Sequence, residues 1–454
     1  MKNEITIVGA GLVGALSAAL LAQRGFAVTV FERRPDPRIH GFLGGRSINL
    51  ALAERGWHGL RVAGLQKHIE PIAVMMRGRM VHHPDGHTEL LRYGRDDSQV
   101  IWSVSRGALN MCLLDAAEAA GAHIHFGQRL DAVDWENSTM VLCDESGIAR
   151  TQSWTTLIGA DGAGSALRAA MTTHSGLGER FEPLQHGYKE LEIPARADRG
   201  FAMEPNALHI WPRGNYMCIA LPNAQGSFTV TLFMPNHSSL NQGNSGFDTV
   251  RTGADAQALF ARDFADALPL IPELEKDFAA NPTGILGTLY LERWHLRGRA
   301  LLIGDAAHAI VPFHGQGMNC GFEDAVELAD LLQDAGSDFA AAFAQFQHRR
   351  KPNADAIAAM ALENYVEMRD SVADAHFLLM RALERTLAAR HPNRLVPRYW
   401  MVTFSRLPYS VAFQRGEIQS AILRELTAGK TSLDRVDLAL ADRLVDERLE
   451  PLTS

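Results

Sequence analysis

The hydrophobic pattern at the start of the chain predicts a strand, a helix and a second strand. Residues 5–8 read Ile-Thr-Ile-Val, an apolar and mostly β-branched run that suits a strand buried on both faces. An Ala- and Leu-rich run then predicts a helix over about residues 12–24, which Gly25 can cap at its C-terminus. A second apolar run over residues 27–31 ends in Glu32. This order of elements indicates an α/β domain with a parallel sheet.

Apolar and polar residues alternate strongly in the middle of the chain. The alternating segments, which turn residues separate, are 186–193, 208–211, 216–221 and 228–233. A hairpin is also predicted over residues 74–93, around the turn Pro84-Asp85-Gly86. These segments predict a mostly antiparallel sheet inserted into the α/β chain. One face of this sheet is polar or aromatic enough to cover a pocket.

Shorter apolar runs predict the remaining elements. The segments concerned are a strand and helix over 100–121, short strands at 123–126, 140–143 and 157–160, a loop that we expect to be mobile at 237–252, a helix over about 255–267, and a buried strand over 299–304. We expect a further helix to begin near Gly321, with Glu323 and Asp324 in its first turn. From about Pro352 the chain is expected to be helical, over 354–368, 372–389 and a last stretch to the end.

These elements place the chain in the α/β class with three regions. The first is a Rossmann-like dinucleotide-binding domain, the second an inserted and mainly antiparallel β-sheet domain for the substrate, and the third a C-terminal helical region. The predicted boundaries are 1–73, 98–180 and 285–350 for the first region, 74–97 and 181–284 for the second, and 351–454 for the third.

Composition excludes some classes of partner. The net charge is −8 over 454 residues, which argues against nucleic acid or an anionic membrane as the main partner. The four cysteines form no C-x-x-C pair, which fits a reducing, cytoplasmic setting. Glu4 and the glycines that follow it make a signal peptide the poorer interpretation of the apolar start. We find no uncharged apolar stretch long enough to predict a membrane-spanning helix.

The turn after the first strand carries the pattern G-x-G-x-x-G at Gly9, Gly11 and Gly14. The first glycine permits a tight turn, the second lets the backbone approach a pyrophosphate, and the third lets the helix pack close to the strand. The helix N-terminus favours the negative charge of the phosphates. Glu32 stands where an acid binds a ribose hydroxyl, so FAD or NAD is expected here rather than NADP.

Three further segments offer groups for an anion or a ring system. Glycines precede Arg46 and Ser47 at a predicted helix start; we favour a diphosphate contact, and a capped surface helix is the alternative. Asp161 follows a buried strand and precedes another helix start, where backbone N–H groups and Arg168 are expected to face an anion. Asp305 follows Gly304 and can accept a hydrogen bond from a ribityl or ribose hydroxyl. The glycine-rich loop over 315–319 can lie flat against a ring system, although a tight connection would also explain it.

Three groups of polar or charged residues are interpreted from their spacing alone. Arg77 and Arg79 are two residues apart and so share one face of a strand, where they could bind a carboxylate or form a solvated edge. The three histidines nearby fit no standard metal-ligand spacing, and we therefore expect no metal site; they are His82, His83 and His87. Asn364 and Met368 are four residues apart on one helix face, and core packing does not readily explain a polar Asn364 there.

Together, the G-x-G-x-x-G turn with Glu32, the Asp161-Gly162 element and Gly304-Asp305 resemble the single-component flavin-dependent aromatic hydroxylases. The resemblance runs from residue 5 to about residue 410. The chain is similar in detail to those members of the family that hydroxylate L-kynurenine, at the segments 45–52, 76–80, 203–212, 307–313, 364–369 and 399–406. The resemblance implies bound FAD, transient NADPH and O2 as co-substrates, and a flavin C4a-hydroperoxide that hydroxylates the ring.

The resemblance also implies roles for individual residues. The amino-acid end of the substrate is assigned to Arg79, Tyr93, Asn364, Met368 and Tyr399. Phe313, His314 and Gln316 are assigned to the surroundings of the substrate ring and the flavin. No general base is assigned, because the amino group of an aniline already activates its ring. The motifs and the resemblance together assign to FAD the residues Gly9, Gly11, Leu12, Val13, Gly14, Glu32, Arg33, Arg46, Ala51, Arg106, Leu130, Asp161, Ala166, Asp305, Gly317, Met318 and Asn319.

The chain departs from the family pattern at several places. Animal members carry Phe where this chain has His314 and Ala where it has Cys320, so ring contacts are expected to differ. The C-terminal membrane anchor of the mitochondrial members is missing, which implies a soluble, bacterial-type protein, and a homodimer is possible. Two other functions stay open at this point. One is hydroxylation of a hydroxybenzoate or anthranilate, which would leave Asn364 and Tyr399 without an obvious partner. The other is a flavin-binding redox sensor or scaffold.

Overall fold

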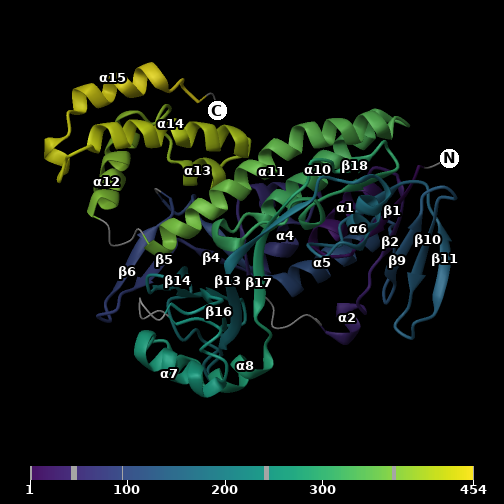
Figure 1. Cartoon of the computed structure of the whole chain (residues 1–454), viewed down its shortest axis with the longest axis horizontal. Coiled ribbons are helices and arrows are strands. Elements are labelled where there is room, and N and C mark those ends of the chain that lie inside the picture. Colours follow the sequence, from purple (N-terminus) through teal and green to yellow (C-terminus); the bar gives the residue numbers. More distant parts are fainter. Residues whose placement is uncertain (1–2, 42–48, 95, 240–244, 371–374, 453–454) are drawn as a thin grey trace.

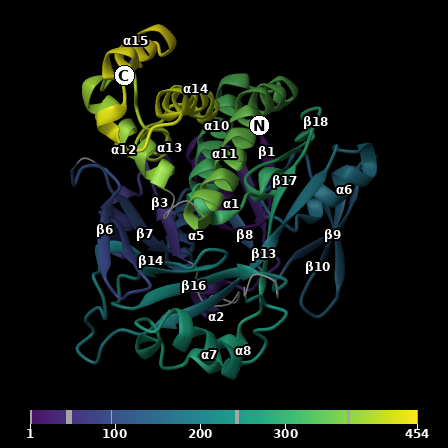
Figure 2. The same ribbon diagram turned by 60° about the vertical axis from the view of Figure 1, so that its left-hand side comes forward.

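Two large sheets and a set of C-terminal helices organise the chain (Figure 1). The structure is a computed structural model that describes residues 3–41, 49–94, 96–239, 245–370 and 375–452. In Figures 1 and 2 the C-terminal helices lie at one end of the molecule and the helices α7 and α8 at the other. The C-terminal helices are α12 (Ala375–Arg390), α13 (Arg398–Thr403), α14 (Tyr409–Thr427) and α15 (Leu438–Arg448).

The six-stranded sheet forms the dinucleotide-binding half and has the order β18-β19-β12-β1-β2-β8. Its strands are β1 (Glu4–Val8), β2 (Ala27–Phe31), β8 (His123–His125), β12 (Leu157–Gly159), β18 (His295–Leu296) and β19 (Ala300–Leu302). All pairings are parallel except that of β18 with β19. The predicted unit β1, α1 (Leu12–Gln23) and β2 is therefore confirmed.

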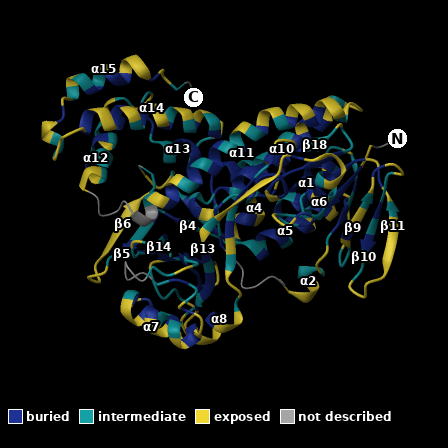
Figure 3. Cartoon of the chain, viewed as in Figure 1, coloured by how far each residue is buried: buried dark blue, intermediate teal, exposed yellow. Residues whose placement is uncertain are grey.

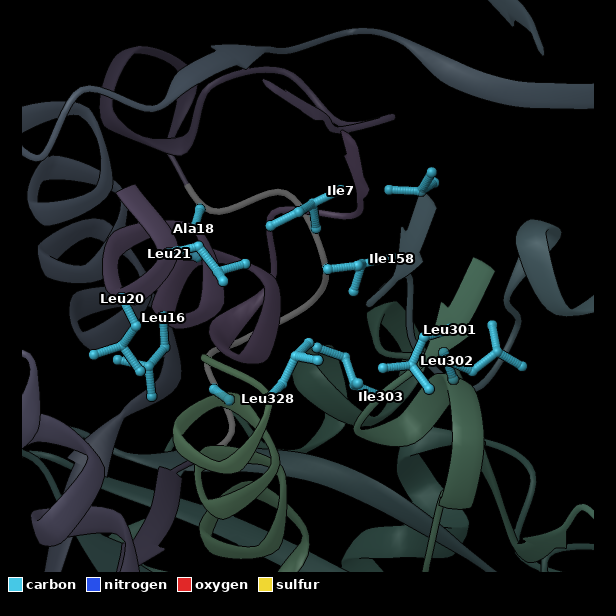
Figure 4. Close-up of a cluster of buried hydrophobic side chains, with 14 of the residues drawn as sticks. Ile7, Leu16, Ala18, Leu20, Leu21, Ile158, Leu301, Leu302, Ile303 and Leu328 are labelled. Atoms are coloured by element: carbon cyan, nitrogen blue, oxygen red, sulfur yellow. The ribbon is translucent and has the colours of Figure 1, made fainter. Parts of the chain in front are cut away.

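The core of this half is built from aliphatic side chains on both sides of the sheet. Helix α1 is buried almost all round, because it packs on the sheet and also against α5 (Arg106–Ala119) and α10 (Gly317–Ala335). Figure 4 shows Leu16 and Leu20 of α1 near Leu328 of α10, with Ile158 and Leu302 of the sheet beside them. The burial of each such side chain contributes about 1.5–3 kcal/mol to the stability of the fold. This packing holds the glycine turn between β1 and α1 in place.

The seven-stranded sheet has the order β17-β13-β16-β15-β14-β5-β6. Its strands are β5 (Gly78–His82), β6 (Thr88–Arg92), β13 (Arg180–Ile193), β14 (Ala207–Pro212), β15 (Met217–Pro222), β16 (Phe228–Pro235) and β17 (Gly284–Tyr290). All neighbours are antiparallel except β5 and β14, so the four predicted strands and their mainly antiparallel pairing are confirmed.

The two faces of this sheet are buried against different partners. The outer face packs against α7 (Gly253–Asp263) and α8 (Leu274–Ala280) through a cluster that includes Trp211 and Phe260. The inner face carries Val81, Ile210 and Phe233, which pack towards the dinucleotide-binding half and α11 (Phe339–Asp370). The strict alternation of the strands explains this division, because neighbouring residues point to opposite faces.

Several predicted boundaries are wrong. Residues 49–52 form the strand β3 and not a helix, and α3 begins only at Glu54. The hairpin expected from residue 74 consists of β5 and β6 alone, because β4 (Ala73–Met76) pairs instead with β7 (Ile101–Ser105) beside β3. Helix α10 begins at Gly317 rather than near Gly321, which puts Glu323 and Asp324 in its second turn.

Helix α11 also differs from the prediction, because it begins at Phe339 and runs through Pro352. A proline inside a helix costs roughly 3 kcal/mol through its missing N–H and its ring clash. Phe343 and Phe346 are fully buried ahead of the proline, and Arg350 bonds to the buried carboxylate of Asp324. These contacts offset the cost and fix the first half of the helix on the dinucleotide-binding half.

The smaller elements complete the chain. They are β9 (Arg129–Asp134), β10 (Thr139–Cys143) and β11 (Ala149–Ser153) in a three-stranded sheet; the helices α2 (Pro37–His40), α3 (Glu54–Val62), α4 (Gln66–Ile69), α6 (Ala166–Ser175) and α9 (Asp305–His308); and the 3-10 turns Glu70–Ile72, Leu268–Leu270, Pro312–His314 and Leu433–Arg435. Figure 3 shows that the outer strand β11 and one side of α11 are exposed, while the middle of the molecule is buried. Part of the loop expected to be mobile, residues 240–244, lies outside the described residues.

Candidate active site

The glycine turn after β1 has the shape that a bound diphosphate needs. Gly9 has a φ of +100°, and a Cβ there would lie 2.6 Å from the Ala160 carbonyl oxygen. A Cβ on Gly14 would lie 2.0 Å from the Gly9 carbonyl oxygen, so α1 can approach the turn only with glycine at this position. Gly11 is different, because no atom lies within 4 Å of its would-be Cβ. Packing does not require a glycine there, and the open space before α1 fits a ligand that approaches the backbone.

Charged groups around this turn favour an anion. Glu32 binds two backbone N–H groups, those of Ala10 at 2.7 Å and Arg34 at 3.0 Å, and so fastens the glycine turn to the end of β2. Partial burial lowers the pKa of Arg34, and the positive charges of Arg33 and Arg106 lower it further, while Glu32 opposes them. A gathering of guanidinium groups at a helix N-terminus is suited to the two phosphates of a dinucleotide.

The structure gives the second predicted anion position a protein partner. The Asp161 carboxylate accepts hydrogen bonds from the backbone N–H of Ala166 at 2.7 Å and of Leu167 at 3.2 Å, and from the Ser165 hydroxyl. Arg168 bonds to the Glu179 carboxylate and to backbone carbonyls. These groups thus have partners within the protein, and the contact of Asp161 and Ala166 with FAD stays a prediction. Asp161 itself caps α6, and burial raises the pKa of its carboxyl.

The loop between β19 and α10 is anchored by the side chain of Asn319. Its amide nitrogen donates to the carbonyl oxygens of Ala51 and Gly315, both at 2.8 Å, and its oxygen accepts from the N–H of Ala53 at 3.0 Å. The asparagine thus joins the end of β3 to the glycine-rich loop. Asp305 lies at the start of this loop and is exposed, where it can reach a ligand.

Arg79 lies against aromatic rings that come from distant parts of the chain. Its guanidinium carbon is 5.8 Å from the ring centre of Tyr93 and 5.7 Å from that of Tyr399. The two tyrosine rings stack at 5.7 Å between their centres, and the His314 ring stacks on Tyr399 at 5.6 Å. These four residues come from β5, the end of the β6 hairpin, α13 and the 3-10 turn before α10.

The electrostatics of this group suit a carboxylate. Burial alone would lower the pKa of Arg79, but Tyr93, Tyr399 and Glu367 raise it overall, so the guanidinium stays charged. Burial raises the pKa of both tyrosines, which keeps their hydroxyls protonated as donors. Burial also lowers the pKa of His314 to about 4, and its Nδ1 has no hydrogen-bond partner among the described residues although it is buried.

An apolar cluster adjoins this polar end. Phe313 packs against Tyr365 at 4.3 Å and against Phe233 of the inner sheet face at 5.0 Å between ring centres. Asn364 of α11 donates to the Phe313 carbonyl oxygen at 2.6 Å and holds the loop against the helix. Aromatic and apolar side chains next to a charged group are the usual surroundings of a flat aromatic ligand with a charged end.

The two arginines that share the motif at residues 77–79 have different partners. Arg77 forms an ion pair with Asp97 at 3.1 Å on the surface, whereas Arg79 faces the tyrosines. His82 lies between Asp266 and His209, and His83 stacks on His87. The structure thus separates Arg79 from Arg77.

Comparisons with known proteins identify the family. The model of the FAD binding domain family matches residues 2–361. Kynurenine 3-monooxygenase of Xanthomonas axonopodis pv. citri (strain 306) is 59% identical over 452 residues, which cover 99% of this chain and 98% of that protein. Kynurenine 3-monooxygenase of Xanthomonas campestris pv. campestris (strain 8004) is 58% identical over 451 residues, with the same two coverages of 99% and 98%. The chain belongs to the kynurenine 3-monooxygenase family.

Solved structures of other flavin oxygenases share the fold of this kynurenine 3-monooxygenase family member. The tetrameric form of 2-methyl-3-hydroxypyridine-5-carboxylic acid oxygenase has a TM-score of 0.64 at 20% identity, covering 83% of this chain and 95% of that one. PqsL of P. aeruginosa in complex with 2-aminobenzoylacetate also has a TM-score of 0.64 at 20% identity, covering 82% and 97%. At this identity the likeness shows the fold alone.

FAD is the bound cofactor of the kynurenine 3-monooxygenase family, and NADPH and O2 are its co-substrates. The residues fit FAD on three observations: the open space at Gly11, the guanidinium groups beside α1, and the unpartnered buried Nδ1 of His314. Among the FAD residues proposed from the sequence, Leu130 is buried in the core and Arg33 is exposed next to the turn. Arg46 and the side chain of Met368 lie outside the described part of the chain.

Sequence reasoning missed two acids near the candidate site of this kynurenine 3-monooxygenase family member. Glu190 lies on the inner sheet face opposite Thr231, and burial raises its pKa to about 7, against the lowering effect of Arg106. The alternation of β13 was the signal that could have found it. The ion pair of Glu367 with Arg381 near Arg79 carried no local signal, because its partners lie on different helices.

Two further observations concern metals and membranes. One group of three possible metal ligands occurs in the described residues, His308, Cys320 and Asp324, but the Arg350 guanidinium bonds to both Asp324 and Cys320. A cation already stands at that position, which disfavours a metal ion. No described helix combines the length and the low polarity that crossing a bilayer requires.

Proposed function

We propose that this chain is a kynurenine 3-monooxygenase, which converts L-kynurenine to 3-hydroxy-L-kynurenine with NADPH and O2 in the degradation of tryptophan. The observation that carries the proposal is Arg79 against the stacked rings of Tyr93 and Tyr399, next to an apolar cluster. An α-amino acid on an aromatic ketone needs both parts. The full-length similarity to proteins of this name supports the same substrate.

In this proposal Arg79 binds the substrate carboxylate and the hydroxyls of Tyr93 and Tyr399 donate to it. Charge-assisted hydrogen bonds of this kind are roughly twice as strong as neutral ones. Asn364 and Met368 complete the amino-acid end. The aromatic ring lies beside Phe313, His314 and Gln316, where Phe233 helps to exclude water.

FAD, when bound, takes reducing equivalents from NADPH and supplies one oxygen atom of O2 to the ring. The protein supplies position and a dry pocket. The aniline amino group of kynurenine activates the carbon ortho to it, so no side chain needs to remove a proton from the substrate beforehand. His314 fits this scheme, because its lowered pKa of about 4 keeps it neutral beside Arg79.

The test is NADPH consumption by the FAD-loaded protein with and without L-kynurenine, with mass analysis of the product. Stimulated consumption with a gain of one oxygen on kynurenine is the expected result. Stimulated consumption that yields only hydrogen peroxide would make kynurenine an effector and the substrate another aromatic acid. Absence of stimulation would contradict the kynurenine assignment while leaving FAD binding intact.

A cytoplasmic location and a homodimer are further parts of the proposal. The location rests on the scattered cysteines of the sequence. Cell fractionation tests the location. Light scattering coupled to size exclusion tests the dimer, and a monomer or a tetramer would contradict it.

A further inference from the structure

A buried arginine fastens the C-terminal region to the dinucleotide-binding half. Arg55 of α3 is 1% exposed. Its Nε donates to the Val402 carbonyl oxygen at 3.0 Å, and its Nη2 donates to the carbonyl oxygens of Met401, at 3.3 Å, and Leu407. A single guanidinium therefore binds the C-terminal end of α13 and the segment that joins α13 to α14. Tyr399 lies in α13, two residues before the first of these carbonyl groups.

The charge of Arg55 is balanced by acids that belong to α10. Its Nη1 bonds to Glu323 at 2.6 Å, and the other oxygen of Glu323 accepts from Arg350 at 3.0 Å. Arg350 also bonds to Asp324 at 2.7 Å, and Asp324 accepts from the backbone N–H of Gly304 at 3.0 Å. The network thus begins at the loop after β19 and ends at the C-terminal region. Such a buried network is costly unless every member has a partner, as it does here.

Tyr409 extends this network to the loop that we place beside the flavin. The Arg55 guanidinium lies 3.9 Å from the centre of the Tyr409 ring, and Tyr409 is fully buried. Its hydroxyl donates to Oε1 of Gln316 at 2.8 Å, and burial raises its pKa, so the proton stays on the tyrosine. Gln316 is 2% exposed and directly precedes α10. Because Oε1 accepts this bond, the orientation of the Gln316 amide is set from the C-terminal region.

We propose that Tyr409 is a positioning residue that orients the Gln316 amide beside the flavin, and that Arg55 keeps Tyr409 in place by binding the segment 401–407. The inference rests on the proposed function to the extent that Gln316 lies next to the flavin ring. The C-terminal helices must therefore be docked for the loop that contains Gln316 to have its correct geometry. They do more than cover the substrate.

Tyr409→Phe tests the positioning role, because it keeps the ring under Arg55 and removes only the hydroxyl. The matched control is Tyr216→Phe, whose hydroxyl bonds to Asp263 at 2.7 Å on the outer side of the seven-stranded sheet. For Tyr409→Phe we expect kcat and the product formed per NADPH to fall by roughly two- to tenfold, the range of one neutral hydrogen bond, with KM for kynurenine little changed. The absorption spectrum of the bound flavin is expected to shift as well.

A double-mutant cycle separates this role from general stability. In a Gln316→Leu background, Tyr409→Phe should cause no further fall in product per NADPH, because the partner of the hydroxyl is already absent. If Tyr409→Phe lowers only the unfolding temperature, as Tyr216→Phe would, and leaves the flavin spectrum and the coupling unchanged, the positioning role is refuted. An additive fall in the double variant would refute it too.

Hydrogen exchange tests the part of Arg55. In the FAD-loaded Arg55→Lys variant, the amides of residues 401–409 should exchange faster than in the wild type, while those of β1 and β2 keep their rates. Unchanged exchange at 401–409 would overturn the anchoring role. These spectral and exchange measurements need no turnover, so they decide the inference even if the wild-type protein fails to hydroxylate kynurenine.

Discussion

The FAD end and the substrate end of the site are built in different ways. The FAD end depends on backbone geometry within short stretches, such as Gly9 to Gly14, where glycine is needed at both ends because a Cβ there would meet backbone atoms. The substrate end depends on side chains from β5, β6, α11 and α13, which meet only in the folded chain. Changes at the first end should therefore affect folding and cofactor binding, and changes at the second should affect the substrate.

The largest effect is expected for Gly14→Ala, because its Cβ would lie 2.0 Å from a backbone oxygen between β1 and α1. Neither backbone can move without disturbing the core, so we expect a destabilisation of roughly 4–5 kcal/mol or more and little folded protein. The measurements are FAD content and thermal unfolding.

Gly11→Ala is the control for this prediction. Open space surrounds its would-be Cβ, so the apoprotein should unfold at the wild-type temperature while FAD affinity falls on the order of tenfold. Equal FAD binding by both variants and the wild type would contradict the difference between the two glycines.

The next effect concerns the substrate. Arg79→Met should lower kcat/KM for kynurenine by roughly 30- to 1000-fold, mainly through KM, because a charged partner of the carboxylate is lost. Arg77→Met should change it less than about fivefold, since the Asp97 pair is a surface ion pair. Steady-state kinetics of both variants measure this. An unchanged KM in Arg79→Met would exclude the carboxylate role.

A smaller effect is expected in the pH dependence of stability. The folded pKa of His314 is about 4, below the unfolded value of about 6.5, so the unfolded state binds more protons between these values. This histidine therefore disfavours the folded state as pH falls from about 6.5 to about 4. His314→Phe should reduce the slope of the unfolding free energy against pH in this range by up to about 1.4 kcal/mol per pH unit. Urea unfolding at several pH values measures this slope.

His209, on the outer face of the seven-stranded sheet, is the control for the pH effect of His314. Burial lowers its pKa to about 4 as well, and its Nε2 bonds to the Glu204 carbonyl oxygen. His209→Gln should flatten the acid dependence in the same way but leave KM for kynurenine unchanged, whereas His314→Phe should alter KM. A steeper loss of stability in either variant would contradict the assignment of the slope to these histidines.

The smallest effect is expected for Tyr399→Phe. The ring that stacks on Tyr93 and on His314 remains, and only the hydroxyl is lost. We expect KM for kynurenine to rise by roughly two- to tenfold, the range of one hydrogen bond, without a change in FAD content. Binding titrations followed by flavin absorption measure this. A loss of FAD instead would place Tyr399 at the cofactor.

Local patterns predicted the parts of the fold that depend on neighbouring residues. The unit around Gly9 and Glu32, the alternating strands and the positions of α5 and α7 follow from periodicity and turn residues, and the structure confirms them. The errors occurred where contacts between distant residues override local preference. Pro352 stays helical because Arg350 and the phenylalanines before it are held by the dinucleotide-binding half.

The candidate site shows the same division. Arg77 and Arg79 are equivalent in their spacing, and the fold gives one a surface acid and the other two stacked tyrosine rings. Asp161 has the spacing of a ligand contact, yet its carboxylate caps the helix that follows.

By itself, then, the sequence determined the strand–turn–helix that can cradle a dinucleotide, the two kinds of sheet, and the residues that resemble a flavin hydroxylase. The tertiary structure alone decided the partners of the buried charges. Arg55 has no signal in its own helix, because its role depends on Glu323, Tyr409 and carbonyl groups more than 260 positions away. The physical reason is that hydrogen bonds and ion pairs act over a few ångströms in space, and only folding sets which residues come that close.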